Sequence, residues 1–347
     1  MKYNLLGNTG LLVSELCLGT MNFGGNHGGA FAKMGKVPQD EATKLVKAAF
    51  DGGINFIDTA NAYSLGESEQ MLGQALKSTG IGRDEVVLAT KVRGQMGEGP
   101  NQSGLSRYHV FNALDQSLQR LQVDHLDVYY VHGEDAYTPV EELMATLDAV
   151  VRSGKVRYVG VCNWPAFRLM QAQAVAERHG GAKFSALQYF YSAACRDIEG
   201  DIMAVARELH LPLMPWSPLA GGFLSGKYTR DAAKDKAGDS RRATFDFPII
   251  DKEKAYNIVD VMRGIAGRQH VSVAEVALAW VRLQPGVTST IIGARNVAQL
   301  QTNLASVALT LTRDDLHAID AVSKRPVLYP EWMVEFQASG RTADARK

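Results

Sequence analysis

The sequence has little cysteine, no net charge and no long apolar run, and each shortage excludes a class of protein. Three cysteines, Cys17, Cys162 and Cys195, are too few and too scattered for a disulfide framework or a cysteine-based zinc site. The 37 basic residues balance the 37 acidic ones, so no overall electrostatic attraction favours nucleic acid or a membrane surface. No apolar stretch reaches the ~20 residues that a membrane-spanning helix needs.

The sequence also lacks a clear signal peptide and any linker. Its N-terminal segment MKYNLLGNTGLLVSEL carries one Lys before a stretch broken by Gly and Asn. Together with the unpaired cysteines, this predicts a protein of the reducing cytoplasm. No Pro/Ser-rich or low-complexity tract divides the 347 residues, which favours a single domain spanning residues 1–347.

Short apolar runs of strand length alternate with amphipathic segments of helix length along the chain. The runs are rich in Val, Ile, Leu and Tyr, as strands buried on both faces are. Eight such units predict an α/β fold in which a parallel sheet closes into a (β/α)8 (TIM) barrel. The dinucleotide fingerprint G-x-G-x-x-G does not follow the first strand, which argues against an open, doubly wound sheet. The predicted strands are residues 16–19, 55–58, 86–90, 126–131, 156–161, 187–189, 213–216 and 290–292.

The chain is longer than a minimal barrel, which needs about 250 residues. The surplus of roughly 100 residues is concentrated in five segments. They are a capping β-hairpin (1–13), two long loops at the C-terminal mouth (21–38 and 93–107), a loop expected to cover a cofactor (217–250) and a C-terminal tail (325–347).

Ionisable side chains stand at the ends of three successive predicted strands. Asp58 ends the second strand, with Tyr63 five residues later. Lys91 lies near the end of the third strand, and His132 ends the fourth. Each has an ordinary structural explanation when taken alone, such as a helix cap for Asp58 or a core histidine for His132. Because neighbouring parallel strands end at one mouth of a barrel, we expect the four side chains to converge there.

This combination of an acid, a phenol, an ammonium and an imidazole favours proton transfer to a carbonyl oxygen. A free tyrosine has a pKa of ~10, and a nearby ammonium such as Lys91 is expected to lower it. Asp58 would hold that ammonium charged, and His132 would polarise the carbonyl. The set contains no nucleophile–base pair and no metal triad, so hydrolysis is disfavoured and we expect no metal. A reduction would need a hydride donor, which is the task of a cofactor.

Several stretches together resemble the aldo-keto reductase family. They are GINFIDTANAYSLGESEQMLGQAL, ATKV, LDVYYVH, SGKVRYVGVCNW and MPWSPLAGGFLSGKY, within a likeness that extends from LGNTGLLVSELCLGTMNFG to IIGARNVAQLQTNL. The resemblance implies a barrel enzyme that reduces aldehydes and ketones reversibly with a nicotinamide cofactor, usually NADPH. It also implies a catalytic tetrad with Tyr63 as the proton donor. The tetrad is Asp58, Tyr63, Lys91 and His132.

The same resemblance implies a cofactor site. Asn163 and Gln188 match the residues that hold the nicotinamide carboxamide, and Trp216 matches an aromatic ring stacked under the nicotinamide. Arg295 matches the residue that pairs with the 2′-phosphate, which is the reason to expect NADP(H) rather than NAD. The other implied cofactor contacts are Ser217, Leu219, Gly221, Lys227, Gly293, Gln299 and Asn303.

The substrate and the rival functions stay open at this point. Phe23 and Trp332 are predicted substrate contacts for an apolar or aromatic carbonyl, although packing within the loop and tail explains them equally well. One rival is a partner or sensor module of the potassium-channel β-subunit type. Another is an isomerase or lyase that uses Lys91 to form a Schiff base. We expect a small-molecule carbonyl substrate, no nucleic-acid or membrane partner, and a monomer or weak homo-oligomer.

Overall fold

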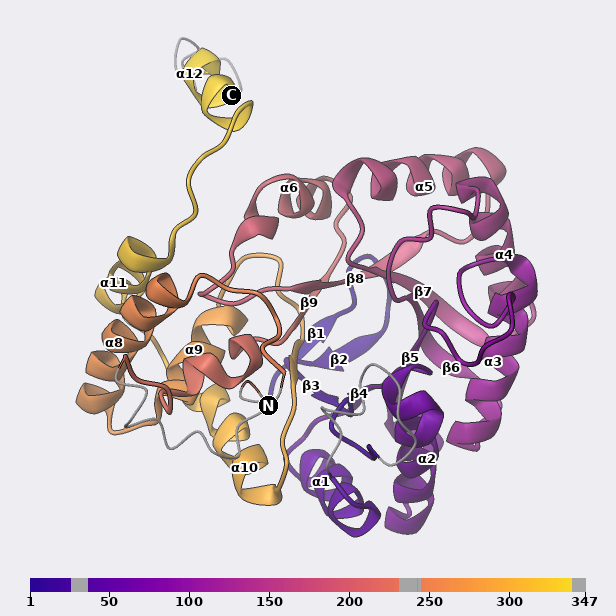
Figure 1. Ribbon diagram of the computed structural model, residues 1–347, viewed down its shortest axis with the longest axis horizontal. Helices are drawn as coiled ribbons and strands as arrows, with labels where there is room; N and C mark the ends of the chain where they lie inside the picture. Colours follow the sequence, from indigo (N-terminus) through magenta and orange to yellow (C-terminus); the bar gives the residue numbers. More distant parts are fainter. Residues whose placement is uncertain (26–36, 231–241, 243–244, 339–347) are drawn as a thin grey trace.

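The computed structural model describes residues 1–25, 37–230, 242 and 245–338 (Figure 1). The barrel strands are β3 (Leu16–Gly19), β4 (Phe56–Asp58), β5 (Val87–Val92), β6 (Leu126–Val131), β7 (Val156–Cys162), β8 (Phe184–Phe190), β9 (Leu213–Trp216) and β10 (Thr290–Ile292). Within the described residues these eight strands form one parallel sheet in the order β10-β3-β4-β5-β6-β7-β8-β9. The sheet curls around a central axis with helices outside it, so the predicted (β/α)8 barrel is confirmed (Figure 1).

The helices pack their apolar faces against the outside of the sheet. In the helix of residues 140–152, for example, Leu143, Leu147 and Val150 recur at three-to-four spacing and are buried. The α-helices are α1 (Gln39–Asp51), α2 (Glu67–Thr79), α3 (Arg107–Leu121), α4 (Val140–Arg152), α5 (Ala166–His179), α6 (Asp201–Glu208), α8 (Lys252–Gln269), α9 (Val273–Arg282), α10 (Val297–Ala305), α11 (Arg313–Ser323) and α12 (Glu331–Ala338). The 3₁₀ turns are η1 (Tyr63–Gly66), η2 (Arg83–Glu85), η3 (Asp197–Glu199), η4 (Ala220–Ser225) and η6 (Ser306–Ala308). Not one of the described helices has both the length and the apolar character to cross a membrane.

A two-stranded hairpin closes the end of the barrel opposite the mouth. Its strands are β1 (Tyr3–Leu5) and β2 (Leu12–Ser14), which pair antiparallel. Leu6 and Val13 are fully buried and belong to the apolar cluster inside the barrel. Gly7 turns the chain with a φ of +56°, and a Cβ there would lie 2.5 Å from Pro212 Cδ. The hairpin predicted over residues 1–13 therefore forms and seals the barrel floor.

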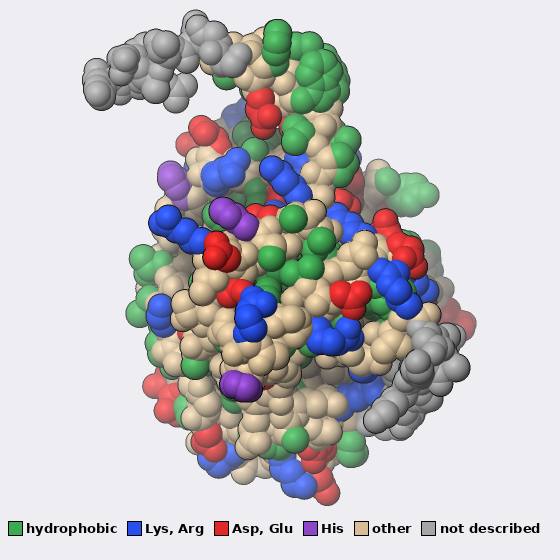
Figure 2. Space-filling view, turned by 90° about the vertical axis from the view of Figure 1, so that its left-hand side faces the viewer, with side chains coloured by type: hydrophobic (Ala, Val, Ile, Leu, Met, Phe, Trp, Pro, Cys, Tyr) green, Lys and Arg blue, Asp and Glu red, His purple; other side chains and the backbone are tan. Residues whose placement is uncertain are grey.

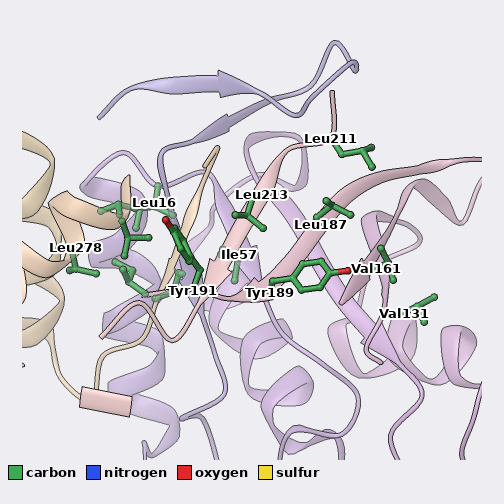
Figure 3. Packing of buried hydrophobic residues seen from close by; sticks show 14 of the residues in the cluster. Leu16, Ile57, Val131, Val161, Leu187, Tyr189, Tyr191, Leu211, Leu213 and Leu278 are labelled. Atoms are coloured by element: carbon green, nitrogen blue, oxygen red, sulfur yellow. The ribbon is translucent and has the colours of Figure 1, made fainter. Parts of the chain in front are cut away.

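Alternate residues of each strand pack into two separate cores. The inner core fills the barrel and includes Cys17, Phe56, Tyr130 and Met214. The outer core lies between the strands and the helices, and Figure 3 shows part of it. Labelled there are Leu16, Ile57, Val131, Val161, Leu187, Tyr189, Tyr191, Leu211, Leu213 and Leu278. Because successive strand residues face opposite sides, neighbouring residues of one strand can serve different cores.

The barrel closes along a seam between β9 and β10. Leu213 at the start of β9 pairs with Val287, which precedes β10. Leu213 N donates to Gly286 O at 3.0 Å, and Thr288 N donates to Leu213 O at 2.9 Å. In the described chain no further β-bridge joins β9 to β10 toward the mouth. The two strands therefore end at the mouth without a ladder between them.

The described part of the C-terminal tail, residues 325–338, leaves the barrel rather than covering it. Beyond α11 an extended segment leads to α12, which projects from the body of the molecule (Figure 1). No residue of α12 is buried, and its side chains stand out at the top of the space-filling view, over a surface of interspersed charges (Figure 2). Parts of the predicted segments lie outside the described residues, namely 26–36, 231–241, 243–244 and 339–347.

Candidate active site

Lys91 belongs to a buried polar cluster at the mouth end of the barrel, where its ammonium contacts Asp58 and Tyr63. Its side chain on β5 is fully buried, and its ammonium makes three hydrogen bonds. Nζ donates to Asp58 Oδ2 at 2.5 Å, to Thr59 O at 2.8 Å and to Tyr63 Oη at 3.3 Å. An ammonium has three N–H donors, so these contacts satisfy all of them and fix its position.

The chain after β4 is held so that Asp58 and Tyr63 face this ammonium. Thr20 N donates to Asp58 O at 2.9 Å, which ties the end of β4 to the end of β3. Ser68, at the start of α2, donates to Thr20 O at 2.8 Å and lies 3.2 Å from Thr59 Oγ1. Between them Tyr63 begins η1 and is 7% exposed. These contacts place the phenol over the barrel interior.

Burial raises the pKa of Tyr63 to about 12, although Lys91 opposes the shift. Asp58 adds to the rise. We expected Lys91 to lower this pKa; it acts in that direction, but the loss of hydration is larger. Burial alone would lower the pKa of Lys91, yet the nearby Asp58 and Tyr63 hold that pKa above its ordinary value. At neutral pH the phenol is therefore protonated and the ammonium is charged.

His132 stands beside Tyr63 at the end of β6. Its N–H donates to Val92 O at 2.9 Å, which continues the pairing with β5. The imidazole meets the phenol edge to face, with ring centroids 5.8 Å apart. Burial, then Lys91 and Arg93, lower the pKa of His132 well below its usual 6.5. The ring is therefore neutral at physiological pH and carries one ring N–H.

A cavity of about 580 Å³ opens above this cluster at the C-terminal ends of the strands. Asp58, Tyr63 and His132 line it, and Lys91 lies buried just beneath. The position matches the mouth of a TIM barrel, and the volume suits a small-molecule site. All eleven residues implied as cofactor contacts also line it: Asn163, Gln188, Trp216, Ser217, Leu219, Gly221, Lys227, Gly293, Arg295, Gln299 and Asn303. In the described chain no three His, Cys, Asp or Glu side chains stand close enough to hold a metal ion.

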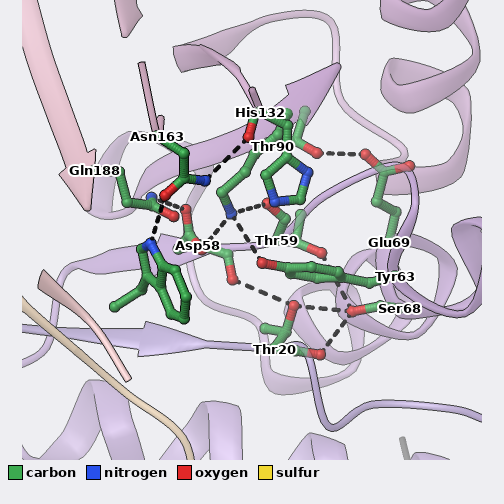
Figure 4. Close-up of polar contacts among 12 residues, drawn as sticks. Thr20, Asp58, Thr59, Tyr63, Ser68, Glu69, Thr90, His132, Asn163 and Gln188 are labelled. Carbon is green, nitrogen blue, oxygen red and sulfur yellow. Dashed lines mark hydrogen bonds and ion pairs between the residues drawn. The ribbon is translucent and has the colours of Figure 1, made fainter. Parts of the chain in front are cut away.

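Two side-chain amides connect the cavity wall to the buried cluster. Gln188 Nε2 donates to Asp58 Oδ1 at 2.9 Å, and Asn163 Nδ2 donates to His132 O at 3.2 Å (Figure 4). Trp216 Nε1 in turn donates to Asn163 Oδ1 at 3.0 Å. The Trp216 ring also stacks with Phe247 at 5.8 Å between centroids. The amides and the indole are thus held side by side around one end of the cavity.

The other end of the cavity is lined by a glycine turn and by two cationic side chains. After β9, Ser217 Oγ accepts from Gly221 N at 2.9 Å, and Gly221 has a φ of +67°. A Cβ on Gly221 would lie 2.6 Å from Phe247 O, so only glycine fits this turn. Lys227 lies beside the same turn, and Arg295 precedes α10 across the seam. Two cations beside a glycine turn would suit the phosphates of a dinucleotide.

The two predicted substrate contacts do not reach this cavity. Phe23 is 1% exposed and packs in the outer core, where its backbone pairs with Val37. Trp332 is 47% exposed on α12, which projects away from the barrel. Neither residue lines the cavity, so the structure gives no support to either assignment. The sequence does not reveal that Phe23, after β3, turns into the outer core, or that the described part of the tail leaves the mouth.

The segments 21–38, 93–107 and 217–250 were expected near the mouth, but several cavity-lining residues within them were not singled out from the sequence. Met21, Asn22, Arg93, Gly94 and Phe247 all line the cavity. A signal existed for Arg93, because it follows Lys91 by two residues and strand residues two apart share a face. The others lie on loops without periodicity, where no pattern predicts which side chains turn toward the mouth.

Comparison with known proteins is consistent with this geometry. The model of the "Aldo/keto reductase family" matches residues 15–324. The chain is 38% identical to "Uncharacterized oxidoreductase YrpG" of Bacillus subtilis (strain 168), over 94% of this chain and 97% of the relative. It is 34% identical to a "Probable voltage-gated potassium channel subunit beta" of Oryza sativa subsp. japonica, over 93% and 96%. It is 30% identical to "Versiconal hemiacetal acetate reductase" of Aspergillus parasiticus, over 95% and 99%.

Proposed function

Because this chain belongs to the aldo/keto reductase family, we propose that it is an NADP(H)-dependent oxidoreductase that reduces aldehydes or ketones to alcohols, reversibly. The family and the oxidoreductases among its relatives support carbonyl reduction in general. One observation carries the finer assignment. The protonated Tyr63 hydroxyl lines the cavity while it contacts the buried Lys91–Asp58 pair.

The residues around the cavity fit a nicotinamide dinucleotide phosphate. Asn163 and Gln188 would hold the carboxamide, and Trp216 would lie against the nicotinamide. Arg295 would pair with the 2′-phosphate, because a guanidinium binds phosphate through two parallel hydrogen bonds. When bound, the reduced nicotinamide supplies the hydride. With the cofactor held by these residues, a carbonyl compound would occupy the space above Tyr63 and His132.

The chain's own side chains manage the proton. Tyr63 Oη donates its proton to the oxygen of the reduced carbonyl, and Lys91 stabilises the phenolate that remains. His132, neutral and adjacent, donates a hydrogen bond to the same oxygen and polarises it. Asp58 keeps Lys91 charged and in place. In the reverse direction the phenolate accepts the proton of an alcohol.

A partner or sensor role is the alternative, and the similarity to a protein named as a potassium-channel β subunit favours it. Such a role would require tight cofactor binding with little turnover. The arrangement of Tyr63, Lys91 and His132 supplies every group that proton transfer needs, which favours the enzyme. One observation distinguishes the enzyme from the partner or sensor, namely turnover of any carbonyl compound with bound NADPH.

The test compares the wild type with Tyr63→Phe. We expect NADPH oxidation with a panel of aldehydes, and a kcat/KM lower by about 10²–10⁴-fold in the variant, as for loss of a general acid. Calorimetry should give the same NADPH affinity in both proteins, whereas Arg295→Gln should weaken binding of NADPH and not of NADH. Equal turnover by Tyr63→Phe would remove Tyr63 from its role. Tight NADPH binding without turnover would favour the sensor.

A further inference from the structure

Arg93 places a positive charge on the cavity wall that the proposed reaction does not use. It follows β5 directly, is exposed, and lines the cavity together with Tyr63 and His132. Its charge reaches His132, whose pKa it helps to lower. Arg93 therefore lines the same cavity as the side chains that would contact a substrate carbonyl.

The backbone of Arg93 is held in an unfavourable conformation. Its φ is +128°, a region that side chains other than glycine rarely adopt. The carbonyl of Arg93 accepts from Gly104 N at 3.0 Å, which fixes both ends of the mouth loop between them. Strained residues of this kind gather at functional sites, where the surrounding structure compensates for their cost.

Within the described residues the guanidinium makes one hydrogen bond, from its Nε edge. Its Nε donates to Glu134 O at 3.0 Å, which lays the side chain along the loop after β6. The carboxylate of Glu134 does not pair with Arg93, because it accepts from Arg168 Nε at 2.8 Å. Among the described residues no carboxylate forms an ion pair with Arg93. Arg93 thus brings to the cavity wall a positive charge that no described carboxylate pairs with.

A second carboxylate in the loop after β6, that of Asp135, is also engaged elsewhere. Asp135 accepts hydrogen bonds from Leu105 N at 2.8 Å, from Tyr137 N at 3.0 Å and from Thr138 Oγ1 at 2.7 Å. Arg93 helps to lower its pKa from a distance but does not contact it directly. Asp135 therefore weakens the positive potential at the mouth without neutralising it.

We propose that Arg93 selects substrates that carry a carboxylate or another anionic oxygen group beside the reacting aldehyde or ketone. This inference rests on the proposed function, because it assigns the substrate class of the same site. A guanidinium recognises a carboxylate through two parallel, charge-assisted hydrogen bonds, which also orient the bound molecule. The anion would lie against Arg93 while the carbonyl oxygen lies against Tyr63 and His132.

The test uses charged and neutral substrates of the same shape. The wild type should reduce 3- or 4-carboxybenzaldehyde with a higher kcat/KM than the matching methyl esters. Arg93→Gln should lower kcat/KM for the acids by about tenfold and leave the esters nearly unchanged, since one hydrogen-bonded charge is lost. Arg93→Lys should keep part of the preference because it keeps the charge.

A matched control separates the effect of a charge at the cavity from the effect of a charge elsewhere on the protein. Arg152→Gln removes one positive charge at the end of α4, where the helix returns to the opposite end of the barrel. It should alter neither class of substrate. A fall of acids and esters together in Arg93→Gln would show a structural role and overturn the proposal, as would a wild type without preference for the acids.

Binding distinguishes this proposal from the proposed function. Calorimetry with 4-(hydroxymethyl)benzoate and its methyl ester measures recognition without turnover. Tighter binding of the acid by the wild type, lost in Arg93→Gln, supports the anion site even if no carbonyl is reduced. Equal binding of acid and ester by the wild type overturns it even if neutral aldehydes are reduced.

Discussion

Strand β5 separates two buried ion pairs that are alike in chemistry and different in surroundings. On its inner side Lys91 contacts Asp58 at 2.5 Å. On its outer side the neighbouring Thr90 donates to Glu69 at 2.5 Å, and Glu69 pairs with Arg120 at 2.6 Å. Adjacent strand residues face opposite sides, so one strand supports a charged cluster in each layer (Figure 4).

What differs is the third partner of each pair. The inner pair contacts the phenol of Tyr63, which has a proton to give and lines a cavity. The outer pair contacts the hydroxyl of Thr90, which is fully buried between the strand and the helices. A buried pair of charges thus supports chemistry only where a transferable proton joins it to a space for substrate. The outer pair holds α2 and α3 to the sheet.

The largest expected effect is on activity, and it should arise on the inner side alone. The double variant Asp58→Asn/Lys91→Met removes both charges at similar volume, so neither is left unpaired. We expect its kcat/KM for aldehyde reduction to fall by about 10²–10⁴-fold, because the phenolate loses its cation. Steady-state NADPH oxidation measures this. If the variant stays folded and fully active, the inner pair is structural and the contrast disappears.

The outer pair should show its effect in stability. Glu69→Gln leaves Arg120 without its carboxylate, and breaking a buried pair costs about 3 kcal/mol of unfolding free energy. Urea denaturation measures the loss, and kcat/KM of the folded variant should stay within about threefold of the wild type. The reverse outcome, a loss of activity at unchanged stability, would link Glu69 to the reaction through Thr90.

The smallest expected effect is a pH dependence of the unfolding free energy that arises from His132, beside the inner ion pair. His132 is neutral in the folded protein because its pKa is lowered, whereas unfolded histidine takes up a proton near pH 6.5. Its contribution is therefore present above that pH and is lost as the pH falls. Between pH 7.5 and 5.5 the wild type should lose up to about 1.4 kcal/mol more than His132→Gln in urea denaturation. Parallel losses would show that His132 is charged in the folded state.

Much of this architecture follows from sequence pattern. Buried strands and amphipathic helices have characteristic periods, so the barrel and the convergence of Asp58, Tyr63, Lys91 and His132 could be predicted. The closing hairpin was equally visible. The pKa of Tyr63 could not be predicted, because its direction depends on the balance between burial and one ammonium, and burial is a property of the folded chain.

The individual side chains of the loops and the tail could not be placed from the sequence, for a different reason. Phe23 and Trp332 were chosen because they are aromatic and belong to segments expected near the mouth. Backbone direction decides whether such a side chain turns inward, outward or away, and no sequence period encodes it. Arg93 was passed over although its position beside Lys91 was informative, because its positive φ is seen only in the fold.

The incomplete ladder between β9 and β10 has a consequence for local opening of the barrel. The residues that would hold the two ends of a dinucleotide flank this seam, with Ser217 and Gly221 after β9 and Gly293 and Arg295 after β10. A ligand that contacts the ends of both β9 and β10 would link the two strands where backbone hydrogen bonds are missing. This link is lost when the ligand leaves. Amide hydrogen exchange at the seam should then report whether a ligand is bound, because exchange is expected to be fast in the empty barrel and slow in the filled one.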